Sequence, residues 1–74
     1  MREIRLSARE HERFLQAMEK RLQERDMTIV DLAEAIGVSE RSIYNFRNDT
    51  SRNPSKFLGA KIANYLEIRP YEYR

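Results

Sequence analysis

The chain has 74 residues, a mass of 8.9 kDa, a formal net charge of +2, no cysteine and one histidine, His11. This length allows one domain with a small core, and the composition excludes a disulfide framework and a thiolate or histidine metal cluster. No apolar run is long enough to span a membrane and residues 1–3 are too charged to begin a secretory signal, so we expect a soluble cytoplasmic protein that has no cofactor and is not an enzyme.

The positive charge is concentrated in the second half of the chain. Residues 40–74 carry seven basic and four acidic groups, whereas residues 1–39 carry seven and eight. Eleven of the 14 basic residues are arginine, whose planar guanidinium suits bidentate contacts with phosphate and guanine. The same composition fits an ordinary solvated surface, so charge alone does not identify a partner.

The first predicted helix follows a capping box, in which Ser7 is followed three residues later by Glu10. Apolar residues then recur at helical spacing, which predicts a helix from Ala8 to about Arg25. We interpret His11, in the first turn, as a surface residue. The apolar stripe is core and consists of Phe14, Leu15, Met18 and Leu22.

Two short helices joined by a tight turn are predicted next. Thr28 and Asp31 form a second capping box, and the helix they begin ends at Gly37, where a left-handed helix end favours a residue without Cβ. Ser39 caps the following helix. The apolar residues of the first of these helices are Leu32, Ala33 and Ile36.

The third helix has a distinct inner and outer face. Helical spacing directs Ile43 and Phe46 inward and places Tyr44 and Asn45 on the outer side. Two short helices with so tight a turn must cross at a steep angle and share one core. This geometry pushes the second of them outward, which suits insertion into a DNA major groove.

A polar segment at residues 48–54 leads to a fourth helix capped by Ser55. Gly59 lies inside this helix, where glycine lowers helix stability by about 1 kcal/mol relative to alanine. Close packing against another helix or chain would explain a glycine at this position. Pro70 interrupts the helical pattern after this helix. The inner face of the helix is predicted to contain Leu58, Ile62, Tyr65 and Leu66.

The two termini are ambiguous in the sequence. Residues 3–6 and 71–73 alternate polar and apolar side chains, which is a strand pattern. Short strands could pair with each other or across a dimer. A frayed end or a final helical turn fits the same residues equally well.

Residues 32–44 resemble the helix-turn-helix of the lambda repressor and Cro superfamily. Residues 54–55, 62–63 and 66–68 are similar to the next helix and turn of that family, so the resemblance spans about residues 10 to 68. It implies a single all-α domain over residues 1–74, of four to five short helices, with the motif at 28–48. It also implies a phage-type regulator that binds double-stranded DNA as a homodimer and represses transcription by occupying its operator. The matching residues are Ala33, Gly37, Val38, Ser39 and Ile43.

Two positions depart from the family pattern. Ile29 stands where phage repressors usually place a glutamine that clamps a phosphate, although the lac repressor family often has an apolar residue there and uses the helix N-terminus itself. Thr28 and the backbone N–H groups after it could therefore still hold a phosphate. Glu67 stands where the family favours glycine.

The resemblance assigns the base-reading positions to the third helix. Arg41 matches guanine, Asn45 matches adenine, and Tyr44 could contact a thymine methyl or a phosphate. Glu40 either accepts from cytosine or stabilises the positive end of its helix. Solvent exposure, or for Tyr44 partial burial, is the alternative at each position. The phosphate-binding candidates are Thr28, Ser39, Ser42, Arg47, Asn48, Arg52 and Lys56.

A rival hypothesis is a helix-turn-helix protein that acts through a protein partner, such as a partner repressor, as an antirepressor or an antitoxin-like protein. The low net charge, the acidic Glu40 and the apolar pair Ile29 and Val30 favour it. The C-terminal apolar residues either form part of the same interface or complete the core. The candidate partner surface consists of Ile29, Val30, Ile68, Tyr71 and Tyr73.

Overall fold

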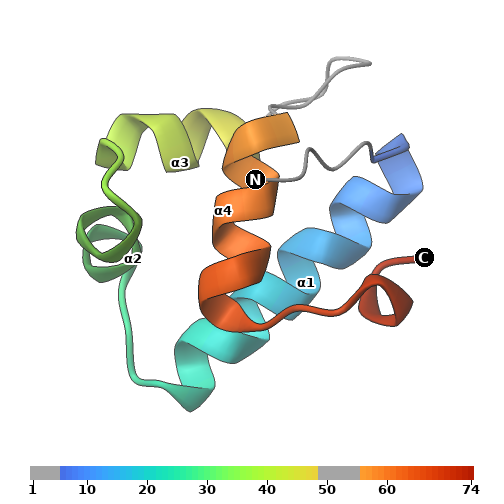
Figure 1. The fold of residues 1–74 in the computed structure, drawn as a ribbon, viewed down its shortest axis with the longest axis horizontal. Helices are drawn as coiled ribbons and strands as arrows, with labels where there is room; N and C mark the ends of the chain where they lie inside the picture. Colours follow the sequence, from blue (N-terminus) through green and yellow to red (C-terminus); the bar gives the residue numbers. More distant parts are fainter. Residues whose placement is uncertain (1–5, 49–55) are drawn as a thin grey trace.

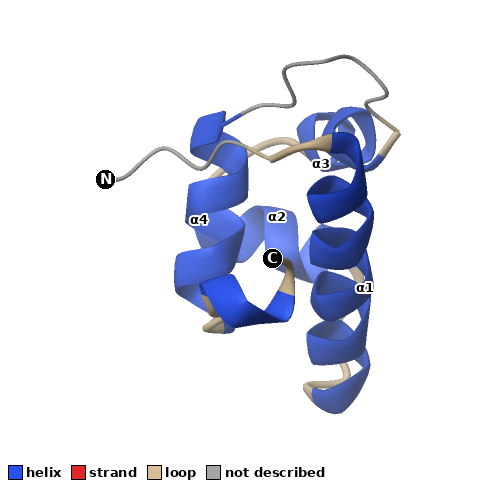
Figure 2. Cartoon of the chain, turned by 90° about the vertical axis from the view of Figure 1, so that its right-hand side faces the viewer, coloured by secondary structure: helices blue, strands red, loops and turns tan. Residues whose placement is uncertain are grey.

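The computed structural model describes residues 6–48 and 56–74, and within these ranges every regular element is helical. Four α-helices are followed by one 3-10 turn, and α4 packs against each of the other three helices (Figures 1 and 2). The predicted all-α fold is confirmed. The strand pattern at residues 3–5, the polar segment at 49–54 and the Ser55 cap lie outside the described residues. The elements are α1 (Ala8–Glu24), α2 (Ile29–Ile36), α3 (Glu40–Arg47), α4 (Lys56–Leu66) and η1 (Pro70–Glu72).

The start of α1 is fixed by the predicted capping box. The Glu10 N–H donates to Ser7 Oγ at 3.2 Å, and the Ser7 N–H donates to Glu10 Oε1 at 3.0 Å. The second of these bonds is the main reason that the pKa of Glu10 lies below its usual range. The helix ends within one residue of the predicted position, at Glu24.

His11 is a core residue, and its prediction as a surface residue was wrong. Its side chain is buried, and its ring meets the Phe46 ring edge-on with centroids 4.9 Å apart. Helical spacing places it one turn before Phe14 on the buried face of α1, so it extends the apolar stripe by one turn. The imidazole thus takes part in the aromatic packing of the core beside Phe46.

Three of the helices end in the same way, with one residue in the left-handed conformation. These residues are Asp26, Gly37 and Glu67, with φ of 53°, 74° and 57°. In each case the next residue is apolar and packs on the core. Its N–H donates to the carbonyl oxygen of the residue five positions earlier, with N–O distances of 2.9 to 3.0 Å, as in a Schellman motif. The three donors are Met27, Val38 and Ile68.

Replacing Glu67 with glycine should stabilise the protein by about 0.5–1 kcal/mol, because a side chain with Cβ is strained in this conformation and glycine is not. The ion pair that is lost, Arg25 to Glu67 at 3.8 Å, is exposed and contributes little. Thermal unfolding should show a melting temperature higher by about 2–8 °C. Asp26→Gly should gain less, since aspartate tolerates this conformation better. A lower melting temperature for Glu67→Gly would contradict the argument.

The inner face of α4 differs from the prediction at one position. Leu58, Ile62 and Leu66 are buried, but Tyr65 is 39% exposed. Arg25 lies over the Tyr65 ring at 5.7 Å from its centroid and donates to the Tyr65 carbonyl at 3.2 Å. Gly59 is buried, but a Cβ there would lie 3.5 Å from the Phe46 ring, which is an ordinary van der Waals distance, so packing against α3 does not by itself require glycine at this position.

The C-terminal segment completes the core as a final helical turn. Ile68 and Tyr73 are each 5% exposed, and the Tyr73 ring packs on Phe14 with centroids 5.4 Å apart. The strand alternative is wrong for residues 71–73. The assignment of Ile68 and Tyr73 to a partner surface is also wrong, because their side chains are covered by the domain itself.

Glu72 holds this turn against α1. Its carboxylate accepts from the Arg69 N–H at 2.7 Å and from Arg21 Nη2 at 2.6 Å. The Arg69 N–H, followed by Arg21, lowers the pKa of Glu72 below its usual range.

The stability that Glu72 provides should therefore depend on pH. A lowered pKa in the folded state means that this stability is fully present above the pKa of the unfolded carboxyl, at about 4.3, and is lost as the pH falls through the folded value. Urea unfolding of Glu72→Gln between pH 3 and pH 6 should show a shallower loss of stability with acid than the parent. Parallel curves would contradict a role for Glu72 in acid unfolding.

Candidate nucleic-acid interface

The unit formed by α2, the turn and α3 has the predicted local structure. Thr28 and Asp31 form a reciprocal capping box at 3.0 and 3.1 Å. Gly37 takes the left-handed conformation, and Ser39 Oγ accepts from the Ser42 N–H at 3.1 Å. Ala33 is 3% exposed, as expected for a small residue where two helices approach closely. The two helices are therefore held at a fixed angle through one short turn (Figure 1).

α3 is anchored on one face and free on the other. Ile43 and Phe46 are 0% and 2% exposed, and they fix the helix to the body of the domain. On the opposite face Arg41 and Asn45 are exposed and Tyr44 is 40% exposed. Glu40 and Asn48, at the two ends of the helix, are exposed as well. The structure therefore brings all four base-reading candidates, Glu40, Arg41, Tyr44 and Asn45, to one solvent-facing surface.

The two serine candidates form a pair. The hydroxyl oxygens of Ser39 and Ser42 lie 2.8 Å apart, and either can be the donor. One hydroxyl proton is used within the pair, so the other remains free to donate to a phosphate oxygen. The pair thus offers one phosphate contact at the start of α3.

The start of α2 offers donors but also carries an acid. The N–H groups of Ile29 and Val30 precede the first backbone bond of the helix, Leu32 N–H to the Thr28 carbonyl. The Thr28 hydroxyl oxygen accepts a hydrogen bond from the Asp31 N–H, so the hydroxyl proton can still be donated to another group. The Asp31 carboxylate, however, already accepts a hydrogen bond from the Thr28 N–H and places a negative charge beside these donors. A phosphate bound here has to lie towards Ile29 and Val30.

Arg47 is held by an acid from a distant part of the chain. Its Nη2 lies 2.7 Å from Glu19 Oε1 on α1, and both side chains are about half exposed. No local pattern in the sequence indicates this pair, because the two residues lie on different helices. Of the remaining phosphate candidates, Arg52 lies outside the described residues and Lys56 begins α4 without a described side chain.

The partner-surface candidates do not form one patch. Ile29 is half-buried against the core, and Val30 beside it is 43% exposed. Tyr71 is 79% exposed but lies on η1, on the other side of the molecule from α2 (Figures 1 and 2). With Ile68 and Tyr73 in the core, only these two exposed side chains remain, and they lie on opposite sides.

Comparison with known proteins agrees with this arrangement. A family model described as helix-turn-helix matches residues 18–73, which include α2, the turn and α3. No curated protein and no solved structure matches the chain. In the part of the chain that the structure describes, no helix is long and apolar enough to cross a membrane.

Proposed function

This chain belongs to the helix-turn-helix family of the lambda repressor and Cro type, a family of DNA-binding regulators, and we propose on that premise that it reads a specific duplex operator and represses transcription by occupying it. α3 would lie in the major groove. Arg41 would read guanine and Asn45 adenine, with Tyr44 on a thymine methyl or a phosphate. The Ser39–Ser42 pair and the start of α2 would fix the register on the phosphates.

The observation that carries this proposal is the contrast between the two faces of α3. Two buried side chains anchor one face of this helix, and arginine, tyrosine and asparagine are exposed on the opposite face. Such a helix holds its exposed side chains in fixed positions for contact with bases. The charge of the second half of the chain, seven basic against four acidic groups, favours approach to DNA. Affinity should fall steeply with salt, because each neutralised phosphate releases counterions.

We further propose that two copies bind together. One α3 of eight residues contacts only a few base pairs. A symmetric pair on half-sites about 34 Å apart, one turn of DNA, would double the contacts. The operator is then an inverted repeat.

Selection of bound duplexes from a random library, with the purified protein at moderate salt, tests the proposal. An enriched inverted repeat is the expected result, and its half-site spacing would give the geometry of the pair. The absence of any enriched sequence, from protein shown by circular dichroism to be helical, would contradict operator reading. Such a result would favour the rival function through a protein partner.

Glu19→Gln should strengthen DNA binding about two- to fivefold, since it removes the carboxylate that competes with phosphates for Arg47 and an exposed pair of this kind is worth up to about 1 kcal/mol. The plot of log affinity against log salt should steepen by about 0.9 if Arg47 gains one phosphate. Fluorescence anisotropy with a labelled duplex measures both. Glu24→Gln is the matched control, because Glu24 is an acid of the same helix that faces Arg21 instead, at 3.8 Å. Equal effects of the two variants would mean that only overall charge matters.

A further inference from the structure

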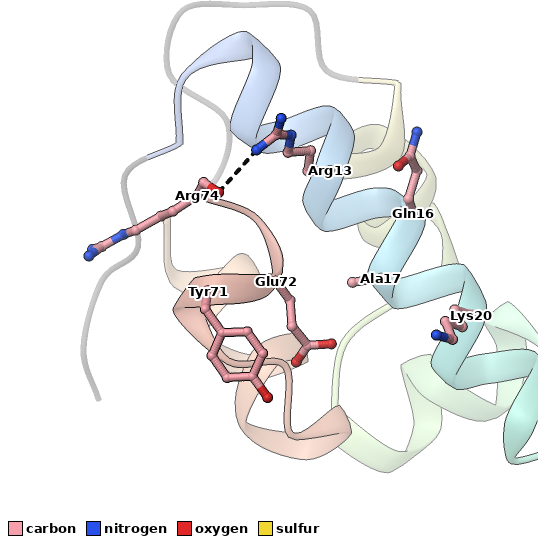
Figure 3. A pocket seen from close by; sticks show the side chains of 7 residues that line it. All are labelled: Arg13, Gln16, Ala17, Lys20, Tyr71, Glu72 and Arg74. Atoms are coloured by element: carbon pink, nitrogen blue, oxygen red, sulfur yellow. Dashed lines mark hydrogen bonds between the residues drawn. The ribbon is translucent and has the colours of Figure 1, made fainter.

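A groove of about 400 Å³ runs between α1 and η1, on a surface to which α3 contributes nothing. Figure 3 shows Ala17 between the two walls, with α1 side chains along one wall and residues of the C-terminal turn along the other. In Figure 1 the C-terminal turn lies at the right of the view and α3 at the upper left. The lining residues are Arg13, Gln16, Ala17, Lys20, Tyr71, Glu72 and Arg74.

The C-terminal wall of the groove is held rigidly around one exposed aromatic side chain. Glu72 is bonded to Arg21 at 2.6 Å, Tyr73 is buried in the core, and the Arg74 carbonyl accepts from Arg13 Nη1 at 3.0 Å. Tyr71 precedes these three anchored residues and is 79% exposed. A tyrosine side chain adds a large contact area at low entropic cost, and tyrosine and arginine are among the residues enriched at binding hot spots.

Of the seven residues that line the groove, three are cationic and one is acidic. Arg13, Lys20 and Arg74 oppose the single acid Glu72, whose carboxylate already accepts two hydrogen bonds. Arg13 and Lys20 are seven residues apart on α1, which separates them by about 10 Å along the helix axis. An extended peptide covers this distance in about three residues, so acidic side chains of one short segment can meet both cations, whereas a single small anion cannot.

We propose that this groove binds an acidic, extended peptide segment of a partner protein, with an aromatic or large aliphatic residue of that segment packed on Tyr71. The partner is recognised by carboxylates meeting Arg13 and Lys20 and by apolar contact with the phenol ring. This function goes beyond DNA reading and uses none of its residues. The regulator can therefore hold DNA through α3 and a second protein through α1 and η1 at the same time.

Phage display of random twelve-residue peptides against the full 74-residue protein tests this proposal. The enriched peptides should combine several Asp or Glu residues with one large apolar residue. A fluorescein-labelled copy of the leading peptide should bind about tenfold or more weakly to Lys20→Glu and to Tyr71→Ala. Both positions are exposed, so both variants should keep the circular dichroism spectrum of the parent. Lys61→Glu, the same charge change on α4 outside the groove, should bind within about twofold of the parent.

Several outcomes would overturn the proposal. Enrichment of neutral or basic peptides, no enrichment, or equal binding to the parent and both groove variants would each do so. Self-association of the parent that Tyr71→Ala abolishes would assign the groove to a second copy instead. Weaker duplex binding by Lys20→Glu than by Lys61→Glu would assign it to DNA. Arg41→Ala separates the two functions, since it should weaken binding of duplex DNA and leave binding of the peptide unchanged.

Discussion

Phe46→Ala should lower the free energy of unfolding by about 3–5 kcal/mol. Phe46 joins three helices: its ring meets His11 and Phe14 of α1 at 4.9 and 5.8 Å and covers the backbone at Gly59 of α4. Truncation removes both edge-on aromatic contacts and leaves a cavity at their junction. For 74 residues the total stability is on the order of 4–11 kcal/mol, so much of it would be lost.

Urea unfolding followed by circular dichroism measures this loss. Phe46→Leu is the matched control, because it keeps most of the buried volume and should cost clearly less than alanine. Since Phe46 also anchors α3, the alanine variant should lose DNA binding together with its folded structure. A loss below about 1 kcal/mol would contradict the central position of this ring.

Arg41→Ala should weaken operator binding by about 1–3 kcal/mol per half-site, which is about 5- to 150-fold, with no loss of folding stability. Arg41 is exposed in the second position of α3, and no contact that holds the fold depends on it within the described ranges. Its guanidinium is the group in this helix that matches the two acceptors of guanine. The loss should therefore be confined to one base position of each half-site.

Repeating the library selection with Arg41→Ala checks this directly. One position of each half-site should become degenerate while the others stay as in the parent. Arg41→Lys is a useful companion, because it keeps the charge and loses the planar fork, so it should restore phosphate attraction but not the base preference. Uniformly weaker binding with unchanged preference would show that Arg41 contacts phosphate only.

The local structure of this protein could be predicted from short segments of its sequence. Ser7, Thr28 and Ser39 begin their helices as expected, because a capping bond joins residues only three apart. Gly37 ends α2 as expected, because the left-handed conformation favours glycine at a single position. The exposure of Arg41 and Asn45 followed from the helical period once Ile43 and Phe46 faced inward. Their contacts with bases remain predictions.

The predictions that failed concern positions whose surroundings depend on a second helix. His11 was expected at the surface but is buried against Phe46 of α3. Tyr65 matched the inner spacing of α4 but lies outside, where Arg25 covers it. The spacing of a residue along the sequence predicts the helix face on which its side chain lies. It does not predict whether a neighbouring helix buries that side chain.

Local patterns in the sequence thus predicted the four helices, the N-caps of the first three and the helix-turn-helix, since hydrogen bonds and helical periods act over a few residues. Tertiary packing, by contrast, places His11 and Tyr73 in the core, brings Glu19 to Arg47, and forms the groove between α1 and η1. Each of these depends on groups from different helices, up to 61 residues apart for Arg13 and Arg74. Such contacts follow from how the helices pack together, which no local pattern in the sequence specifies.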